Sequence, residues 1–326
     1  PACYGLGGDQ PTVTDANMVL GYLPDMALLG GDMALDRAAA ERAVQIVADA
    51  LGLPLKKAAA GIVDIVNENM CGALRTVSVE QGHDPRDFAL IAFGGAGPLH
   101  ANALGKLMGS WPVIIPPGPG VLCAYGDATT RVRDEASRTF IRGFSKTSAD
   151  EVSGVFQELA DQAAGTLDAE GVPRGDQSTS YQVDIRYHGQ GLLLTVNVDL
   201  DELNSKGLDA IGVPFDEMHR QLFTFALELE KEVVNLRAVV QGQPTNVTAA
   251  TAGKGSADAS AAVITEHEVY AGGKRQAAKI YDRAKLLAGN RIPGPAVIME
   301  MDATSLILPD HTGEVDSLGN ILINPS

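Results

Sequence analysis

Apolar residues follow two different periods in the first part of the chain, and the alternation predicts an α/β arrangement. Residues 35–51 and 58–77 carry apolar side chains at close to helical spacing, so both segments are predicted helices. Residues 88–93 form a continuous apolar run, as expected for a central strand buried on both faces. A glycine-rich turn, a helix to about Met108 and a short strand at 113–115 follow. This order is typical of an α/β domain with a largely parallel sheet.

The pattern changes after about residue 145. A helix is predicted at 149–169, followed by strands at 181–187 and 192–198 that flank a glycine-containing turn. Strands that come as pairs between helices are α+β in character. We therefore expect a separate α+β domain over residues 146–242.

The last third of the chain differs again. Residues 243–262 are small and polar, which predicts an exposed, flexible loop or linker. Residues 263–326 contain several short apolar runs separated by Gly and Pro turns, which predicts a β-rich C-terminal domain. The expected fold is thus an α/β domain over residues 1–145, followed by α+β and β-rich domains.

Composition and charge limit the classes of function and partner that fit this chain. The chain has 326 residues, of which 45% are hydrophobic and 20% charged, which suits a folded protein of two or three domains. Its formal net charge of −16 would repel nucleic acid or an anionic membrane over most of the surface. No apolar run reaches the length of a membrane span. We expect neither nucleic acid nor a membrane as a partner, although backbone amides can still bind an anion locally.

The cysteines and histidines give no pattern typical of a metal site. Cys3, Cys71 and Cys123 are odd in number, widely spaced and without a CxxC pair, which argues against a disulfide framework or a zinc ribbon. There is no HExxH segment, no histidine pair at i, i+4 and no carboxylate cluster. We expect no metal ligands, and a reducing cytoplasm as the compartment.

The strongest chemical signal is the turn after residues 88–93. Glycine lets a backbone approach a ligand closely, and a helix N-terminus offers free amides, so this joint predicts a phosphate or nucleoside site. A tight structural turn is the alternative, because the spacing fits neither a Rossmann nor a P-loop motif. His100 follows in the helix and is the one catalytic candidate, unless it is a core or surface histidine. The candidate binding residues are Gly94, Gly95, Ala96, Gly97 and Pro98.

The loop at residues 116–120, Pro-Pro-Gly-Pro-Gly, follows the strand at 113–115. In α/β folds, ligands bind at the carboxyl ends of parallel strands, so this loop is a second candidate for a ligand wall. A rigid turn with a purely structural role explains the same residues equally well.

Six segments resemble, in order, the hydantoinase A family, also called the hydantoinase/oxoprolinase family. Its members look like ATP-dependent enzymes built on the nucleotide-binding fold of actin, Hsp70 and sugar kinases, which is of the RNase H-like type. The segments are PACYGLGG with PTVTDANMVLGYL at 1–23, HDPRDFALIAFGGAGPLHANALGKLMG at 83–109, IIPPGPGVLCAYGDATTRVRDEASRTF at 114–140, DIRYHGQGLLLTVNV at 184–198, EVVNLRAVV at 232–240 and GNRIPGPAVIMEMDATSLILPDHTGEVDSLGNILI at 289–323.

The resemblance implies roles for particular residues. The turn at 94–98 matches the family's adenosine-side glycine motif and would line ATP. The neighbouring helix would contribute Asn67, Asn69 or Arg75 to the base or ribose. The segment 114–140 has Arg131 where members often carry Asp, so no role is transferred to that position.

Members also carry phosphate loops of DxGGTxTD type upstream of the PACYG segment, and this sequence has none. Since the first residue is also not Met, the chain is expected to be a C-terminal portion of an A-type subunit. It would then hold half of the ATP cleft, with the Mg²⁺ ligands upstream. We therefore expect it to be inactive as an ATPase without that N-terminal region.

The family implies activation of a carbonyl group by ATP. Some members hydrolyse cyclic amides such as hydantoin, 5-oxoproline or a lactam, and others carboxylate ketones; many need a B-type subunit. Hydrolysis of a cyclic amide is the leading hypothesis. A ketone carboxylase subunit and a non-catalytic regulatory or assembly module remain alternatives. A simple sugar kinase is disfavoured, because a minimal kinase has no need of the segments after residue 145.

Overall fold

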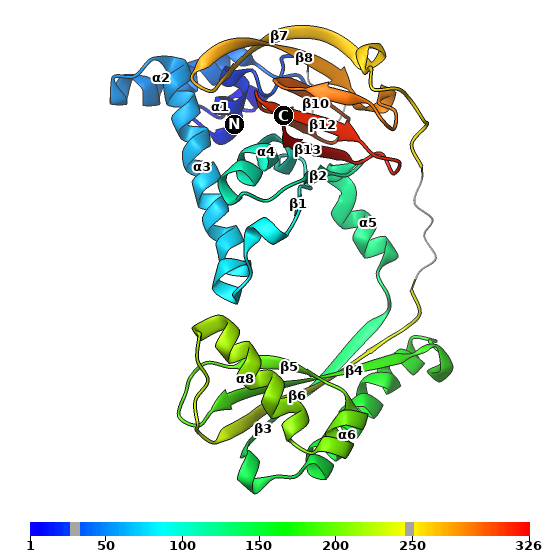
Figure 1. The fold of residues 1–326 in the computed structure, drawn as a ribbon. Helices are drawn as coiled ribbons and strands as arrows, with labels where there is room; N and C mark the ends of the chain where they lie inside the picture. The colour runs from blue at the N-terminus through cyan, green and yellow to red at the C-terminus, as the bar shows by residue number, and fades with distance from the viewer. Residues whose placement is uncertain (27–32, 245–250) are drawn as a thin grey trace. The chain divides into compact units, whose positions relative to one another are not determined.

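The computed structural model describes residues 1–26, 33–244 and 251–326. The chain divides into two compact units (Figure 1). The first comprises residues 1–127 together with residues 248–326, and the second comprises residues 128–247. Along the described parts of the chain, no helix is both long and apolar enough to cross a membrane.

Side-chain caps and a glycine set the ends of the N-terminal helices of the first unit. Thr12 caps the first helix in a capping box with Asp15, and Asp36 caps the second. Gly52 ends the second helix in the left-handed conformation. The helices are α1 (Val13–Leu20), α2 (Arg37–Leu51), α3 (Leu55–Val77), α4 (Gly97–Met108) and α5 (Leu122–Thr129).

A four-stranded sheet lies beside the N-terminal helices in the first unit. Its strands, in the order β11-β10-β8-β7, are β7 (Val263–Ala271), β8 (Lys274–Asp282), β10 (Ala296–Met299) and β11 (Thr304–Ile307). Residues of α1, α2 and α3 share one hydrophobic core with residues of β7, β8 and β10. The two ends of the sequence therefore build one core.

A five-stranded sheet of the same unit also joins distant segments. Its order is β1-β2-β13-β12-β9, formed by β1 (Leu90–Ile91), β2 (Val113–Ile115), β9 (Arg291–Pro293), β12 (His311–Val315) and β13 (Ile321–Pro325). β1 and β2 are parallel, as expected, and β13 pairs antiparallel with β2. Residues 263–326 are thus not a separate C-terminal domain. They complete the first unit, because the fully buried Ile321 and Ile323 pack with the β2 side chains.

The apolar run at 88–93 is also not a central strand. β1 covers two residues at the edge of its sheet, and Ile91 is 55% exposed. Phe88 and Phe93 are likewise exposed. A continuous apolar run predicts burial on both faces only where neighbouring elements cover them, and none of the described elements covers this edge.

The second unit is an antiparallel sheet covered by helices (Figure 1). Its strand order is β3-β6-β4-β5, with β3 (Arg133–Gly143), β4 (Ser178–Tyr187), β5 (Leu194–Val198) and β6 (Lys231–Gln241). The helices α6 (Ala149–Ala169), α7 (Leu200–Lys206) and α8 (Asp209–Phe223) share its core. Because β3 pairs along its length with β6, the boundary lies near residue 127 instead of 145.

The predicted linker at 243–262 lies partly outside the described residues. Its described end, residues 251–262, packs into the first unit: Lys254 and Asp258 form isolated bridges with Ala288 and Arg291. Ala259 and Ala262 are buried. Eight of these twelve residues are exposed, as predicted, so the segment is a largely exposed stretch that is fixed to the first unit at these points.

Candidate functional site

The glycine turn joins β1 to α4 in an open conformation. Gly94 has a φ of 82°, in the left-handed region that favours glycine, and its N–H donates to the carbonyl oxygen of Pro119 over 2.7 Å. α4 then begins at Gly97 with Pro98 in its first turn and without a side-chain cap. Pro98 has no N–H, and the Leu99 N–H donates to the carbonyl oxygen of Ala96 over 3.1 Å, so the first turn of this helix offers few free amides to an anion.

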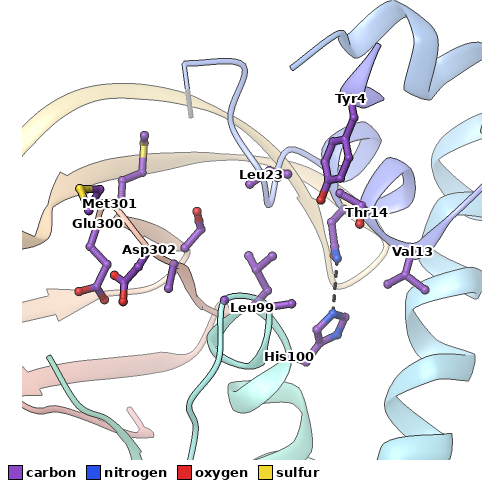
Figure 2. Close-up of a pocket in the computed structure, with 15 residues that line it drawn as sticks. Tyr4, Val13, Thr14, Leu23, Leu99, His100, Glu300, Met301 and Asp302 are labelled. Atoms are coloured by element: carbon purple, nitrogen blue, oxygen red, sulfur yellow. Dashed lines mark hydrogen bonds between the residues drawn. The ribbon is translucent and has the colours of Figure 1, made fainter. Parts of the chain in front are cut away.

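A cavity of about 400 Å³ lies beside this turn, within the first unit (Figure 2). It is enclosed by α1, the start of α4 and the turn between β10 and β11. Its walls are mixed, with apolar, amide, hydroxyl and carboxylate side chains. The lining residues are Tyr4, Val13, Thr14, Asn17, Leu23, Gly95, Ala96, Leu99, His100, Met299, Glu300, Met301, Asp302, Ala303 and Thr304.

His100 is held in the cavity wall by two amides from other helices. Its Nδ1 lies 2.8 Å from Oδ1 of Asn67 on α3. Its Nε2 lies 3.4 Å from Nδ2 of Asn17 on α1, the contact dashed in Figure 2. His100 is 5% exposed, and burial lowers its pKa, so the ring is neutral at pH 7. A neutral ring that donates from Nδ1 and accepts at Nε2 satisfies both contacts. Both ring nitrogens are engaged in these contacts, and a catalytic role for His100 stays a prediction.

The other candidates on α3 divide into one buried and two exposed residues. Asn67 is buried and reaches the cavity only through His100. Asn69 and Arg75 are exposed and do not line the cavity. The structure therefore brings the turn, His100 and Asn67 together and leaves Asn69 and Arg75 outside.

Two acids in the turn between β10 and β11 were not predicted as site residues. Oε2 of Glu300 accepts a hydrogen bond from the Gly118 N–H over 3.3 Å, and burial raises the pKa of Glu300 to about 6. Asp302 lines the cavity beside it. Oε1 of Glu300 and Oδ2 of Asp302 are both buried without a hydrogen-bond partner. The sequence signal was an acidic MEMD turn between two apolar strands, but nothing local connects it to residues 94–98.

The Pro-Pro-Gly-Pro-Gly loop contacts both the glycine turn and the turn between β10 and β11. A Cβ at Gly120 would lie 2.5 Å from the carbonyl oxygen of Asp302, so only glycine permits this approach. Pro119 accepts the Gly94 hydrogen bond, and Gly118 donates to Glu300. The loop therefore holds the glycine turn against the β10–β11 turn, and none of its residues lines the cavity.

The polar groups around this cavity suit some parts of a nucleotide better than others. The start of α4 offers few free amides to an anionic group, whereas the unpaired oxygens of Glu300 and Asp302 suit hydroxyl or amine donors. Among residues 1–26, 33–244 and 251–326, no group of three or more His, Cys, Asp or Glu could hold a metal ion.

Comparison with known proteins gives consistent matches along the chain. Residues 1–136 match the family described as hydantoinase/oxoprolinase, and residues 142–317 match the hydantoinase/oxoprolinase C-terminal domain. Caprolactamase subunit alpha of Pseudomonas jessenii is 34% identical, over 100% of this chain and 48% of its own length. Acetophenone carboxylase gamma subunit of Aromatoleum aromaticum is 32% identical, over 95% and 44%. 5-oxoprolinase 1 of Arabidopsis thaliana is 27% identical, over 99% and 26%.

The crystal structure of the ATP-dependent caprolactamase from Pseudomonas jessenii superposes with a TM-score of 0.86 at 30% identity, covering 100% of this chain and 48% of that one. This match confirms the expected fold class, a mixed α/β fold of the actin-like ATPase type. The chain spans about half the length, or less, of these relatives. With both family domains matched over nearly all of its residues, the chain belongs to the hydantoinase/oxoprolinase family.

Proposed function

We propose that this chain is part of an ATP-dependent enzyme that activates the carbonyl group of a cyclic amide for hydrolysis. The observation that carries the proposal is the similarity of this whole chain to 48% of caprolactamase subunit alpha, whose solved counterpart is described as ATP-dependent. 5-oxoprolinase 1, a second relative, is also named for a cyclic amide. The open glycine turn beside a 400 Å³ cavity gives such an enzyme a place for ligands.

An amide carbonyl is a poor electrophile, and a phosphoryl group on its oxygen makes the carbon open to attack by water. ATP would supply that group when bound. In this chain Gly94, Gly95 and Gly97, with Ala96 and Pro98, would line the nucleotide; the exposed backbone of Gly95 and Ala96, which also line the cavity, supports this assignment.

Mg²⁺ is expected with ATP in phosphoryl transfer. The described residues do not form a metal site, so no step is assigned to Mg²⁺ within this chain. Its ligands are expected in the N-terminal region that the family carries upstream.

A partner subunit is part of the proposal. Several relatives are named as subunits, among them the alpha subunit of caprolactamase and the gamma subunit of acetophenone carboxylase. We therefore expect a B-type subunit to complete the enzyme, in the cytoplasm and without nucleic acid or membrane.

A second candidate function is ATP-dependent carboxylation of a ketone. It is favoured by the 32% identity to acetophenone carboxylase gamma subunit over 95% of the chain. Both functions start by activating a carbonyl oxygen, so they share the nucleotide side of the site and differ in the acceptor. A non-catalytic assembly module is the third candidate.

Turnover by the complete enzyme separates these candidates. The full-length protein with its B-type partner is incubated with hydantoin, 5-oxoproline, caprolactam or acetone, with and without ATP and bicarbonate. ATP-dependent ring opening supports the proposal, and ATP- and bicarbonate-dependent consumption of acetone supports the carboxylase. Absence of any nucleotide-dependent turnover would leave the assembly module as the function, and the nucleotide product identifies how ATP is cleaved.

A further inference from the structure

The short strand β1 has a free backbone edge on the side away from β2. The Leu90 N–H donates to the carbonyl oxygen of Pro112 over 3.1 Å. The Ala92 N–H donates to the carbonyl oxygen of Ile114 over 2.9 Å. Successive residues of a strand direct their N–H and C=O groups to opposite sides, so those of Ile91 point away from β2. No strand in the described parts of the chain pairs with that edge.

The side chains along this edge are apolar and open to solvent. Phe88, Ile91 and Phe93 are each about half exposed. Edge strands of natural proteins commonly carry a charge or a proline that prevents another strand from pairing with them. The run at 88–93 contains neither. Its composition is that of a strand inside a sheet, although its place in the described fold is at the edge.

An apolar groove of about 320 Å³ lies beside the free edge, between β1, α3 and α4 in the first unit (Figure 1). Residues 90–93 form one wall, and every lining residue is apolar or glycine. The groove shares no residue with the cavity beside the glycine turn. Exposed apolar surface of this kind marks a site of protein contact. The helices contribute Met70, Ala73 and Leu74 from α3 and Gly97, Ala101 and Leu104 from α4.

The lengths of the relatives indicate which protein segment covers this surface. The chain matches 48% of caprolactamase subunit alpha and 44% of acetophenone carboxylase gamma subunit. More than half of each of these relatives therefore lies outside the matched region. A segment of the same polypeptide is tethered near the edge, which gives it a higher effective concentration than a separate subunit or a second copy has.

We propose that an apolar strand from the part of the full-length polypeptide outside these 326 residues pairs with the free edge of β1. Its backbone would hydrogen-bond to the N–H and C=O of Ile91, and its side chains would fill the groove between α3 and α4. β1 would then be an internal strand, with Ile91 and Phe93 covered. The proposal rests on the proposed function only in assuming the longer polypeptide, and involves neither nucleotide nor substrate.

Cysteine labelling of the full-length polypeptide tests whether the edge is covered. Ile91→Cys is compared with Leu51→Cys, an exposed position on α2 outside the groove, both with Cys123→Ser to remove the exposed native cysteine. Maleimide should modify Ile91→Cys at least about tenfold more slowly than Leu51→Cys, because a paired edge is reached only after local opening. Equal rates, measured by mass spectrometry, would overturn the proposal.

A charge in the groove tests whether side chains of the added strand fill it. Ala73 is exposed in this structure, so Ala73→Glu leaves the packing of the first unit intact and still puts a carboxylate into the groove. Labelling of Ile91→Cys should then become about as fast as that of Leu51→Cys. Ala50→Glu, at an exposed position on α2, is the matched control and should leave labelling slow. Slow labelling in both variants, or fast labelling in both, would contradict the assignment of the groove.

Photo-cross-linking identifies the segment that covers the edge. Phe88→p-azidophenylalanine keeps the shape of an exposed side chain beside β1, and the irradiated full-length polypeptide is digested and sequenced by mass spectrometry. The linked peptide should come from the same polypeptide, outside these 326 residues, at every protein concentration and without a B-type subunit. A link to a second copy, a link that needs the B-type subunit, or no link overturns the proposal. Because no ATP is used, failure here is independent of the turnover experiment that tests the proposed function.

Discussion

Replacing Glu300 by glutamine should stabilise the first unit at neutral pH. Glu300 lies in the turn between β10 and β11, where one carboxylate oxygen accepts from Gly118 and the other is buried without a partner. Burial raises its pKa from 4.5 to about 6; the charge of Asp302 acts in the same direction, and Arg283 and the Gly118 hydrogen bond oppose it. Glutamine has the same shape, keeps an oxygen for Gly118 and carries no charge.

The magnitude follows from proton linkage. A difference of one pKa unit between the folded and unfolded chain corresponds to about 1.4 kcal/mol, so 4.5 against about 6 gives at most about 2 kcal/mol. The folded-state pKa is the raised one, so this stability is fully present below pH 4.5 and is lost as the pH rises through 6. Wild type should therefore lose about 2 kcal/mol relative to Glu300→Gln between pH 4 and pH 7.5.

The assay uses the single tryptophan of the chain, Trp111, which lies in the same unit as Glu300. Urea unfolding is followed by its fluorescence at several pH values for wild type and Glu300→Gln, with Glu80→Gln as a control at an exposed position of that unit. The free energy of unfolding of the control should follow wild type throughout. If the difference between wild type and Glu300→Gln is the same at pH 4 and pH 7.5, the carboxylate is not buried as the structure shows.

Three further outcomes are expected. Gly95→Val should raise the Kd for ATP of the complete enzyme at least about tenfold. The urea midpoint of the first unit should stay the same, because the added Cβ meets a backbone oxygen only at 3.4 Å. Unchanged ATP affinity would contradict the nucleotide assignment. Gly120→Ala should lower the free energy of unfolding by about 1–3 kcal/mol, because its Cβ would lie 2.5 Å from a backbone oxygen, whereas Gly126→Ala has open space and serves as control. Equal stability of these two variants would refute the close packing. Iodoacetamide should modify the native chain at the exposed Cys123 and spare Cys3, whose pKa burial raises to about 12; mass spectrometry of the native chain showing modified Cys3 would be the contrary result.

Helices and turns were predictable because their signals are local. The segment predicted as 35–51 forms α2 at Arg37–Leu51, and the one predicted as 58–77 forms α3 at Leu55–Val77. The helix expected to end near Met108 does so. Helical periodicity, caps and the Gly-Pro start of α4 are properties of neighbouring residues, so the sequence states them directly.

The family could also be identified from the sequence, because six segments keep their residues and order. The glycine turn at 94–97 was correctly placed between a strand and a helix. Its role in binding ATP stays a prediction, since it rests on the resemblance and on the open backbone.

What only the tertiary structure decided are pairings between distant segments. β13 adds to β2 through Ile321 and Ile115, and this joins the end of the chain to the first unit instead of leaving a separate domain. Hydrophobic periodicity shows that a strand is buried but carries no information on its partner. The prediction of a separate domain at 263–326 was therefore wrong, and the second unit begins near residue 128 instead of 146, whereas its predicted end at 242 lies close to the observed one.

The candidate site was hidden for the same reason. His100 meets Asn17 across 83 positions of sequence, and the turn that carries Glu300 and Asp302 lies some 200 positions from the glycines it contacts. Each of these residues has an ordinary neighbourhood in the sequence. The sequence determined which chemical groups the chain has and which helices, strands and turns carry them. Packing of those elements around a shared core determined which groups face the same cavity, because contacts between side chains depend on distances that no local sequence pattern contains.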